Sequence, residues 1–166
     1  MVYFHILYIC RLILTLKVVT KKKIKAISVI LASDHAGFRL KEKIKRFLLK
    51  KRKKILDLGT KNINSVDYPD YAHLLSKQMK KNRNQMGILI CGSGTGMSMT
   101  ANKHKNIRAA QCYNIKSTKL SREHNNANVM TLGARLIKTD IALKCVNIFL
   151  NTNFNGGRHL RRVKKI

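Results

Sequence analysis

The chain has 166 residues, a length that suits one domain with a sizeable core and argues against two domains. It carries 35 Lys and Arg against 7 Asp and Glu, which gives a net charge of +28. Such an excess invites a nucleic-acid or membrane-surface function. The basic residues are spread along the chain without interleaved aromatic residues that stack on bases, so we expect a solvated basic surface and no specific nucleic-acid site.

The cysteines are widely separated and lack the paired spacing of a zinc site or of a small disulfide framework. They are Cys10, Cys91, Cys112 and Cys145. This spacing predicts free thiols, no metal site and a reducing compartment, which we take to be the cytoplasm. Three of the thiols are expected to be packing residues, whereas Cys91 stands at the edge of a glycine-rich loop.

Residues 1–24 differ from the rest of the chain. They are largely apolar, but Arg11 and Lys17 interrupt the apolar run and three lysines follow it. A signal peptide or a membrane span would have a cleaner apolar segment. We therefore expect a poorly ordered or dispensable extension, or a wrongly assigned start, with membrane association as the alternative; the domain proper is residues 25–166.

Within this domain, short apolar runs alternate with helical patterns. The runs predict strands at residues 26–32, 54–58, 87–91, 107–112 and 128–132. In the first helical pattern an apolar face alternates with solvated basic residues, and its members are Leu40, Ile44, Phe47 and Leu48. Further helices are expected after Pro69, over residues 95–103, from about Ser117, and around residues 142–149. This alternation predicts an α/β fold in which helices cover both sides of a parallel sheet.

In open parallel sheets the site lies at the carboxyl ends of the strands. This rule brings three segments to one edge of the predicted sheet: Asp34 with His35, residues 91–96, and residues 133–135. His35 at such an edge could also be a helix-capping or packing residue.

The central segment is GILICGSGTG, residues 87–96, in which a buried strand leads to Cys91 and then to Gly92, Gly94 and Gly96. Glycines let successive amides converge on one anion, and a helix starting near Thr95 would add its free amides. The spacing is one residue short of a dinucleotide motif and lacks the Gly-Lys-Ser/Thr of a P-loop. An anionic sugar or phosphate group would suit the loop, and the alternative is a strand-to-helix turn with a structural cysteine.

Several side chains in or beyond this loop could take part in chemistry. Cys91 could serve as a base or nucleophile, and the Ser93 hydroxyl could donate to an oxyanion. His124 could move a proton at a sugar oxygen, or simply end a helix. Arginines near the carboxyl terminus could hold a phosphate or only add to the general charge.

Together these segments resemble the family of ribose-5-phosphate isomerase B and the galactose-6-phosphate isomerase subunits. The resemblance covers residues 25–166 and rests on several blocks in family order. These are Ser33-Asp34-His35-Ala36-Gly37-Phe38, Asp67-Tyr68-Pro69, residues 90–96, Ala101-Asn102-Lys103, Ser121-Arg122-x-His124-Asn125 and Gly156-Gly157-Arg158-His159-x-x-Arg162.

The resemblance implies a five-stranded, Rossmann-like α/β/α sandwich and a homodimer with shared active sites, with a tetramer as the alternative. It implies an aldose–ketose isomerase of the pentose phosphate pathway that converts ribose 5-phosphate to ribulose 5-phosphate. No metal, no organic cofactor and no membrane are expected. Isomerisation of a six-carbon sugar phosphate, such as allose or galactose 6-phosphate, is the alternative, and a basic nucleic-acid-binding protein is a third hypothesis.

The resemblance also implies residue roles. Cys91 is the base that moves a proton between C2 and C1, and His124 assists ring opening. The other implied site residues bind substrate, its enediolate or its phosphate: Asp34, His35, Gly92, Ser93, Gly94, Thr95, Gly96, Asn125, Arg135, Arg158 and Arg162. One branch of the family has serine in place of the cysteine and uses a glutamate after the glycine loop; here that position is Met97, so Cys91 has no evident substitute.

Overall fold

The structure is a computed structural model that describes residues 28–79 and 85–166. The extension expected at residues 1–24 lies outside the described residues. Five parallel strands form one sheet in the order β2-β1-β3-β5-β4. They are β1 (Ser28–Ser33), β2 (Lys54–Asp57), β3 (Gln85–Cys91), β4 (Ala109–Gln111) and β5 (Val129–Gly133). This arrangement confirms the α/β fold with a five-stranded parallel sheet.

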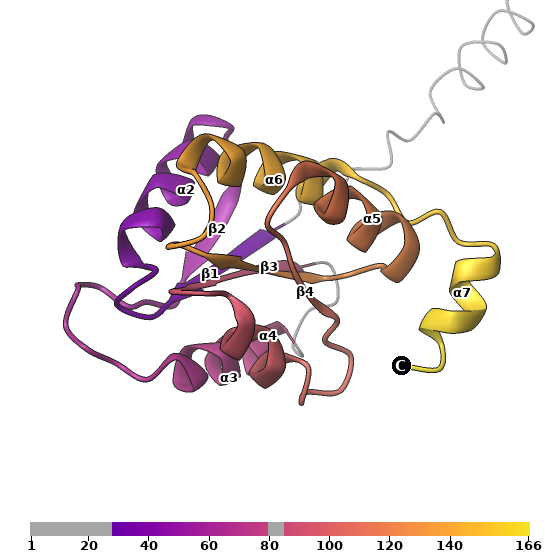
Figure 1. Ribbon diagram of the computed structural model, residues 1–166, viewed down its shortest axis with the longest axis horizontal. Coiled ribbons are helices and arrows are strands. Elements are labelled where there is room, and N and C mark those ends of the chain that lie inside the picture. The colour runs from indigo at the N-terminus through magenta and orange to yellow at the C-terminus, as the bar shows by residue number, and fades with distance from the viewer. Residues whose placement is uncertain (1–27, 80–84) are drawn as a thin grey trace, which may run out of the picture.

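Helices cover both faces of the sheet, as Figure 1 shows. One layer contains α2 (Phe38–Lys50), α5 (Ile115–Asn125) and α6 (Thr139–Asn151), and the other contains α3 (Tyr68–Met79) and α4 (Thr95–Ala101). A last short helix, α7 (Arg158–Val163), lies beside the end of α5 and apart from both layers. The result is a three-layer α/β/α sandwich, as expected.

The central strands are apolar because both of their faces are covered. In β3, Ile88 and Ile90 pack with α2 and α6 on one face, while Leu89 and Cys91 pack with α3 and α4 on the other. Successive side chains of a strand point to opposite faces, so a strand buried on both sides reads as a continuous apolar run. Cys91 therefore points toward the layer that contains α3 and α4.

The helices follow the predicted amphipathic patterns. In α2, Leu40, Ile44 and Leu48 are buried and Phe47 is partly buried, which confirms the predicted face. A further residue of this helix, Lys41, is also buried and was not predicted to be. Within the residues that the structure describes, no helix has the length and apolar character needed to cross a membrane.

Candidate active site

A cavity of about 250 Å³ lies at the carboxyl ends of the central strands. It brings together segments that follow β1, β3 and β5, as predicted from the strand-end rule. Its lining consists of Asp34, Tyr68, Cys91, Gly92, Ser93, Gly96, Arg135 and Leu136. The volume suits a small substrate, and the nearly buried Cys91 is 4% exposed.

The glycine loop has the backbone shape that the sequence predicts. Gly94 adopts a positive φ of 83° and precedes the first residue of α4, Thr95. A Cβ at Gly94 would lie 3.0 Å from the Gly133 nitrogen, so the loop packs directly on the end of β5. Only glycine combines this conformation with this close approach.

The thiol of Cys91 accepts a hydrogen bond from this loop. The Gly94 N–H donates to Cys91 Sγ at 3.0 Å. The sulfur is therefore held against a backbone donor of the glycine loop. The neighbouring Thr95 N–H donates to the Ser93 hydroxyl at 3.3 Å, so Ser93 helps to shape the loop as well as lining the cavity.

Asp34 and Arg135 bring opposite charges to the cavity. Asp34 is 6% exposed, and its Oδ1 accepts from the Gly37 N–H at 2.8 Å, which fixes the carboxylate at the start of α2. The Arg135 guanidinium lies over Gly92, where its Cζ would be 3.3 Å from an added Cβ. The Arg135 N–H donates to the Gly92 carbonyl at 3.0 Å, so the arginine is tied to the glycine loop.

His35, adjacent to Asp34, is held outside the cavity lining. Its Nδ1 lies 3.2 Å from the backbone nitrogen and oxygen of Val66, in the segment that precedes α3. This contact joins the loops after β1 and β2, the packing role that we weighed for this histidine.

Sequence reasoning gave no role to two residues of this site. Tyr68 lines the cavity, and its ring occupies the space where a side chain at Gly96 would stand. Gln111, at the end of β4, reaches the glycine loop and donates to the Ser93 carbonyl at 2.9 Å. Tyr68 belongs to a block that carries the family resemblance, but only the folded chain shows which atoms either side chain contacts.

The remaining predicted residues form a second group around the end of α5. The rings of His124 and His159 stack with centroids 4.2 Å apart and planes 6° from parallel. His159 belongs to α7, which also carries Arg158 and Arg162. Partial desolvation and the nearby charges of His124, Arg158 and Arg162 lower the pKa of His159, which favours its neutral form.

Arg122, in the same motif as His124, has a structural role. Its guanidinium donates to the Ala127 carbonyl and, at 3.2 Å, to the Thr152 carbonyl. Burial and the charge of Arg108 lower the pKa of Arg122. The side chain therefore anchors the end of α5 to the segments that follow α5 and α6.

The group around Cys91 lies at the carboxyl ends of the strands, and the group around His124 lies at their amino ends, called here the amino edge of the sheet. Helix α5 begins just after the carboxyl end of β4 and ends just before the amino end of β5, so its 11 residues run along the strands from their carboxyl ends to their amino ends. The Arg108 side chain, just before β4, donates to the Asn126 carbonyl at 2.9 Å, which places the end of α5 at the amino edge. Cys91 and His124 are thus separated by roughly 15 to 20 Å within one chain.

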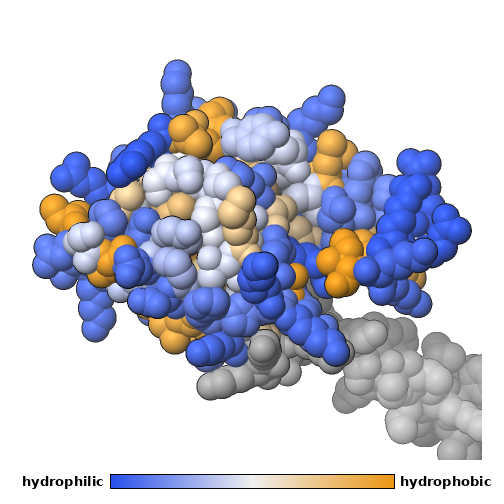
Figure 2. Space-filling view, turned by 60° about the horizontal axis from the view of Figure 1, so that its bottom comes forward, coloured by the Kyte–Doolittle hydropathy of each residue, from blue (hydrophilic) through white to orange (hydrophobic). Residues whose placement is uncertain are grey.

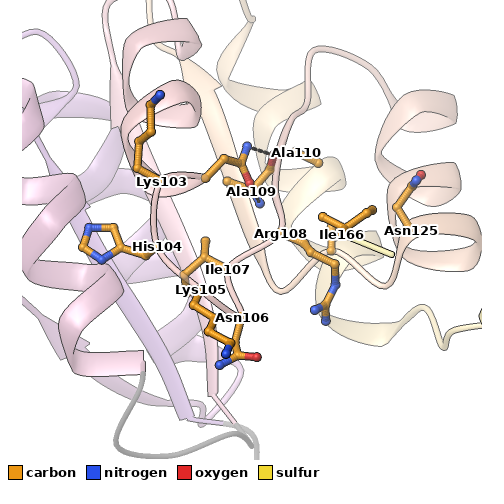
Figure 3. Close-up of a pocket in the computed structure, with 12 residues that line it drawn as sticks. Lys103, His104, Lys105, Asn106, Ile107, Arg108, Ala109, Ala110, Asn125 and Ile166 are labelled. Carbon is orange, nitrogen blue, oxygen red and sulfur yellow. Dashed lines mark hydrogen bonds between the residues drawn. The ribbon is translucent and has the colours of Figure 1, made fainter. Parts of the chain in front are cut away.

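A second and larger cavity, of about 630 Å³, lies at this amino edge. It is formed by the segment between α4 and β4 together with Asn125, Ala127 and Ile166. Figure 3 shows Asn125, Arg108 and Ile166 on one side of the cavity and Lys103 and His104 on the other. Burial lowers the pKa of Arg108, whose side chain has a carbonyl partner in Asn126. Asn125 therefore lines this second, cationic cavity and not the cavity that contains Cys91.

Comparisons with known proteins agree with this geometry. The sequence pattern of the ribose/galactose isomerase family matches residues 29–166. Ribose-5-phosphate isomerase B of Escherichia coli strain K12 is 39% identical over 133 residues, which are 80% of this chain and 89% of that protein.

Two crystal structures are similar over most of their length. Ribose 5-phosphate isomerase B from Thermotoga maritima has 47% identity and a TM-score of 0.82, with 84% of this chain and 96% of that chain covered. The enzyme from Mycoplasma genitalium, solved with bound ribulose 5-phosphate, has 42% identity and a TM-score of 0.81, with 84% and 93% covered. The chain therefore belongs to the ribose/galactose isomerase family.

Proposed function

We propose that this protein is an aldose–ketose isomerase that interconverts ribose 5-phosphate and ribulose 5-phosphate. The observation that carries the proposal is the cavity in which Cys91 stands beside the glycine loop, in a chain of this family. The binding of ribulose 5-phosphate by the similar enzyme from Mycoplasma genitalium supports the choice of substrate.

Cys91 is the base in this proposal. Its thiolate removes the proton from C2 of the open-chain aldose, the C2 electrons form a C1–C2 double bond, and the C1 carbonyl oxygen takes the negative charge of the enediolate. The O2 proton then moves to O1, and the thiol formed in the first step returns its proton to C1 while O2 becomes the carbonyl of the ketose. The Gly94 N–H on Sγ supports the thiolate that the first step requires. Met97, at the position where one branch of the family has a glutamate base, is fully buried in the core, which leaves Cys91 in that role.

The glycine loop stabilises the enediolate. Negative charge develops on the substrate oxygens during proton abstraction, and fixed donors at those oxygens lower the barrier. We assign this role to the amides of residues 92–96 with the Ser93 hydroxyl, and we assign substrate contacts to Asp34 and Arg135. His35, which lies outside the cavity lining and contacts Val66, is assigned only the support of the neighbouring Asp34. The presence of Asp34, Gly92, Ser93, Gly96 and Arg135 in the lining of one cavity with Cys91 supports the assignment.

We infer that the complete site is shared between two copies of the chain. A five-carbon sugar phosphate cannot span the separation between Cys91 and His124 in one chain, so both groups act on one substrate only if different subunits supply them. In a homodimer, the second subunit would contribute His124 for ring opening, Asn125 for substrate binding, and Arg158 and Arg162 for the phosphate. Guanidinium groups suit this last task because they bind phosphate bidentately.

The His124–His159 stack supports the role of His124. Stacking fixes the orientation of the His124 ring, and a neutral His159 avoids a second positive charge against it. A histidine held in this way can exchange a proton with the ring oxygen of the sugar. We place the activity in the cytoplasm, because the described cysteines are all free thiols.

The test is an isomerase assay on the purified protein with three substrates. We expect ribose 5-phosphate to be converted to ribulose 5-phosphate, and the reverse reaction to be measurable. Allose 6-phosphate and galactose 6-phosphate, assayed in parallel, should react with lower kcat/KM. A higher kcat/KM on either six-carbon substrate would overturn the choice of substrate, and no turnover of any of the three would overturn the proposal as a whole.

A further inference from the structure

Gln111 is the last residue of β4 and lies beside the glycine loop. In the sheet it is in register with Thr131 of the neighbouring β5. Its side chain leaves the strand end and contacts two residues of the loop. Nε2 lies 2.9 Å from the Ser93 carbonyl oxygen and 3.1 Å from Thr95 Oγ1.

The orientation of this amide follows from its partners. A carbonyl oxygen only accepts, so the NH₂ end of Gln111 must face Ser93. The Thr95 hydroxyl can both donate and accept, and it lies 3.4 Å from Gln111 Oε1. Gln111 is therefore a donor to the main chain of the loop.

The Ser93 carbonyl belongs to the same peptide group as the Gly94 N–H. That N–H is the donor to Cys91 Sγ at 3.0 Å. A single peptide plane thus accepts a hydrogen bond from Gln111 on its oxygen and donates one to the thiol from its nitrogen. Rotation of this plane, which would turn the N–H away from sulfur, requires the loss of the Gln111 bond.

We propose that Gln111 is a positioning residue for Cys91, acting through the Ser93–Gly94 peptide. It holds the Gly94 N–H on the sulfur, and its own N–H polarises the peptide so that the bond to the thiolate is strengthened. This inference rests on the proposed role of Cys91 as the base. It adds that Gln111, at the end of β4, helps to determine the reactivity of the Cys91 thiolate.

Titratable groups also face Cys91, and they influence its thiolate independently of Gln111. The titratable side chains of its cavity are Asp34 after β1, Tyr68 of α3 and Arg135 after β5. Among the described residues, the Gln111 side chain hydrogen-bonds to Ser93 and Thr95 and to none of these groups, and glutamine is uncharged at every pH. Its replacement by an apolar residue therefore tests the hydrogen bond without changing the charge of the site.

The experiment measures the rate at which iodoacetamide alkylates Cys91 as a function of pH. The protein carries Cys10→Ser, and the modified thiol is identified by peptide mass. Cys112 and Cys145 are buried, and burial raises the pKa of Cys112 to about 11 and raises that of Cys145, so both stay unreactive near neutral pH. This assay reports on the thiolate whether or not the protein is an isomerase.

We expect Gln111→Leu to slow alkylation of Cys91 at pH 7 roughly three- to tenfold. The pH at which the rate reaches half of its plateau should rise by roughly 0.5 to 1. Gln111→Glu, which keeps the size but replaces the donor with a carboxylate, should slow alkylation at least as much. In the isomerase assay both variants should lower kcat more than they raise KM.

Gln78→Leu is the matched control, because Gln78 stands in the last turn of α3, at the opposite end of the helix from Tyr68. It should leave the alkylation profile unchanged. If Gln111→Leu and Gln111→Glu retain the wild-type alkylation profile while remaining folded by circular dichroism, the proposal is wrong. If they shift the profile in a protein without isomerase activity, the positioning role stands and the proposed function fails.

Discussion

Lys41 holds the loop after β2 through a buried ion pair. Its ammonium group, on a side chain 1% exposed, donates to both carboxylate oxygens of Asp57 at 2.8 Å. Asp57 also accepts from the Gly59 N–H at 3.0 Å, and the Gly59 carbonyl in turn accepts from the Ser33 N–H at 2.7 Å. Ser33 immediately precedes Asp34, so this network supports the wall of the cavity that contains Cys91.

The ion pair leads to a prediction about stability. Asp57→Asn leaves the buried ammonium of Lys41 with the partly exposed Glu42 as its remaining carboxylate partner and should reduce the free energy of unfolding by about 3 kcal/mol, the lower end of the cost of breaking a buried pair. Glu42→Gln is the control, because Glu42 also contacts Lys41 but is 33% exposed, and it should reduce the free energy by about 1 kcal/mol. Urea unfolding at pH 7 measures both, and equal losses would contradict the assigned importance of Asp57.

The same pair predicts how stability depends on pH. Burial opposes ionisation of Asp57, but hydrogen bonds from Lys41, Lys45 and Gly59 outweigh it and lower the pKa of this carboxyl below 3.8. The folded state therefore binds the proton less readily than the unfolded chain. The contribution of ionised Asp57 to the free energy of unfolding is complete above about pH 4 and is lost as the pH falls through the lowered pKa. The difference in free energy of unfolding between wild type and Asp57→Asn should therefore become smaller in acid.

At the scale of elements, the connection from β3 to α4 determines the geometry of the loop. The positive φ of Gly94 and its contact with the end of β5 leave no room for a side chain. Gly156 offers a comparison, since it has a φ of 65° and no atom of the described residues within 4 Å of an added Cβ. The two glycines share the backbone conformation and differ in their surroundings.

We predict that Gly94→Ala is more harmful than Gly156→Ala. Both variants place alanine in the left-handed region, at about 1 to 2 kcal/mol each, and Gly94→Ala adds the close contact with Gly133. It should also displace the Gly94 N–H from Cys91 and lower kcat roughly a hundredfold. Thermal unfolding and the isomerase assay measure the two effects; unchanged turnover in Gly94→Ala would argue against the role of the loop.

The elements also show how far sequence reasoning reached. The apolar runs of β1, β3 and β5 were predictable because strands buried on both faces have continuous apolar sequences. Strand β4 is shorter than expected, because Arg108 and Ile107 bond to Asn128 and His104 instead of extending the ladder. Hydrophobic periodicity could not identify α7, because this helix has six residues and none of them is buried.

Within the candidate site, the residues that follow the strands were predictable from the sequence, whereas the side chains that approach them from other elements were not. The strand-end rule brought Asp34, His35, Cys91 and Arg135 to one edge because it depends only on topology, and all of them except His35 line the cavity. Tyr68 and Gln111 approach through side-chain contacts that no local pattern encodes. The position of His124 at the opposite edge depends on the direction in which α5 crosses the sheet, which becomes clear only in the folded chain.

At the scale of the whole molecule, polar side chains dominate the face shown in Figure 2. Figure 2 shows hydrophilic side chains around the face that carries α3 and α4, with small, separate hydrophobic groups among them. Large apolar residues that are exposed include Met99, Tyr113, Leu136 and Ile166. The two cavities lie at opposite ends of the strands, and in the proposed homodimer they meet only across two subunits.

Subunit complementation tests this central claim most directly. One parent carries Cys91→Ala, and the other carries His124→Ala with Arg158→Ala. Each parent alone should show less than about one hundredth of wild-type isomerase activity, because each lacks one half of every site.

Unfolding and refolding the two parents together should restore about one quarter of wild-type activity. Half of randomly paired dimers are mixed, and each mixed dimer has one intact site of two. Distinct affinity tags on the parents confirm that mixed dimers form. Recovery to this level is the result that the account predicts, and no recovery in purified mixed dimers would contradict it.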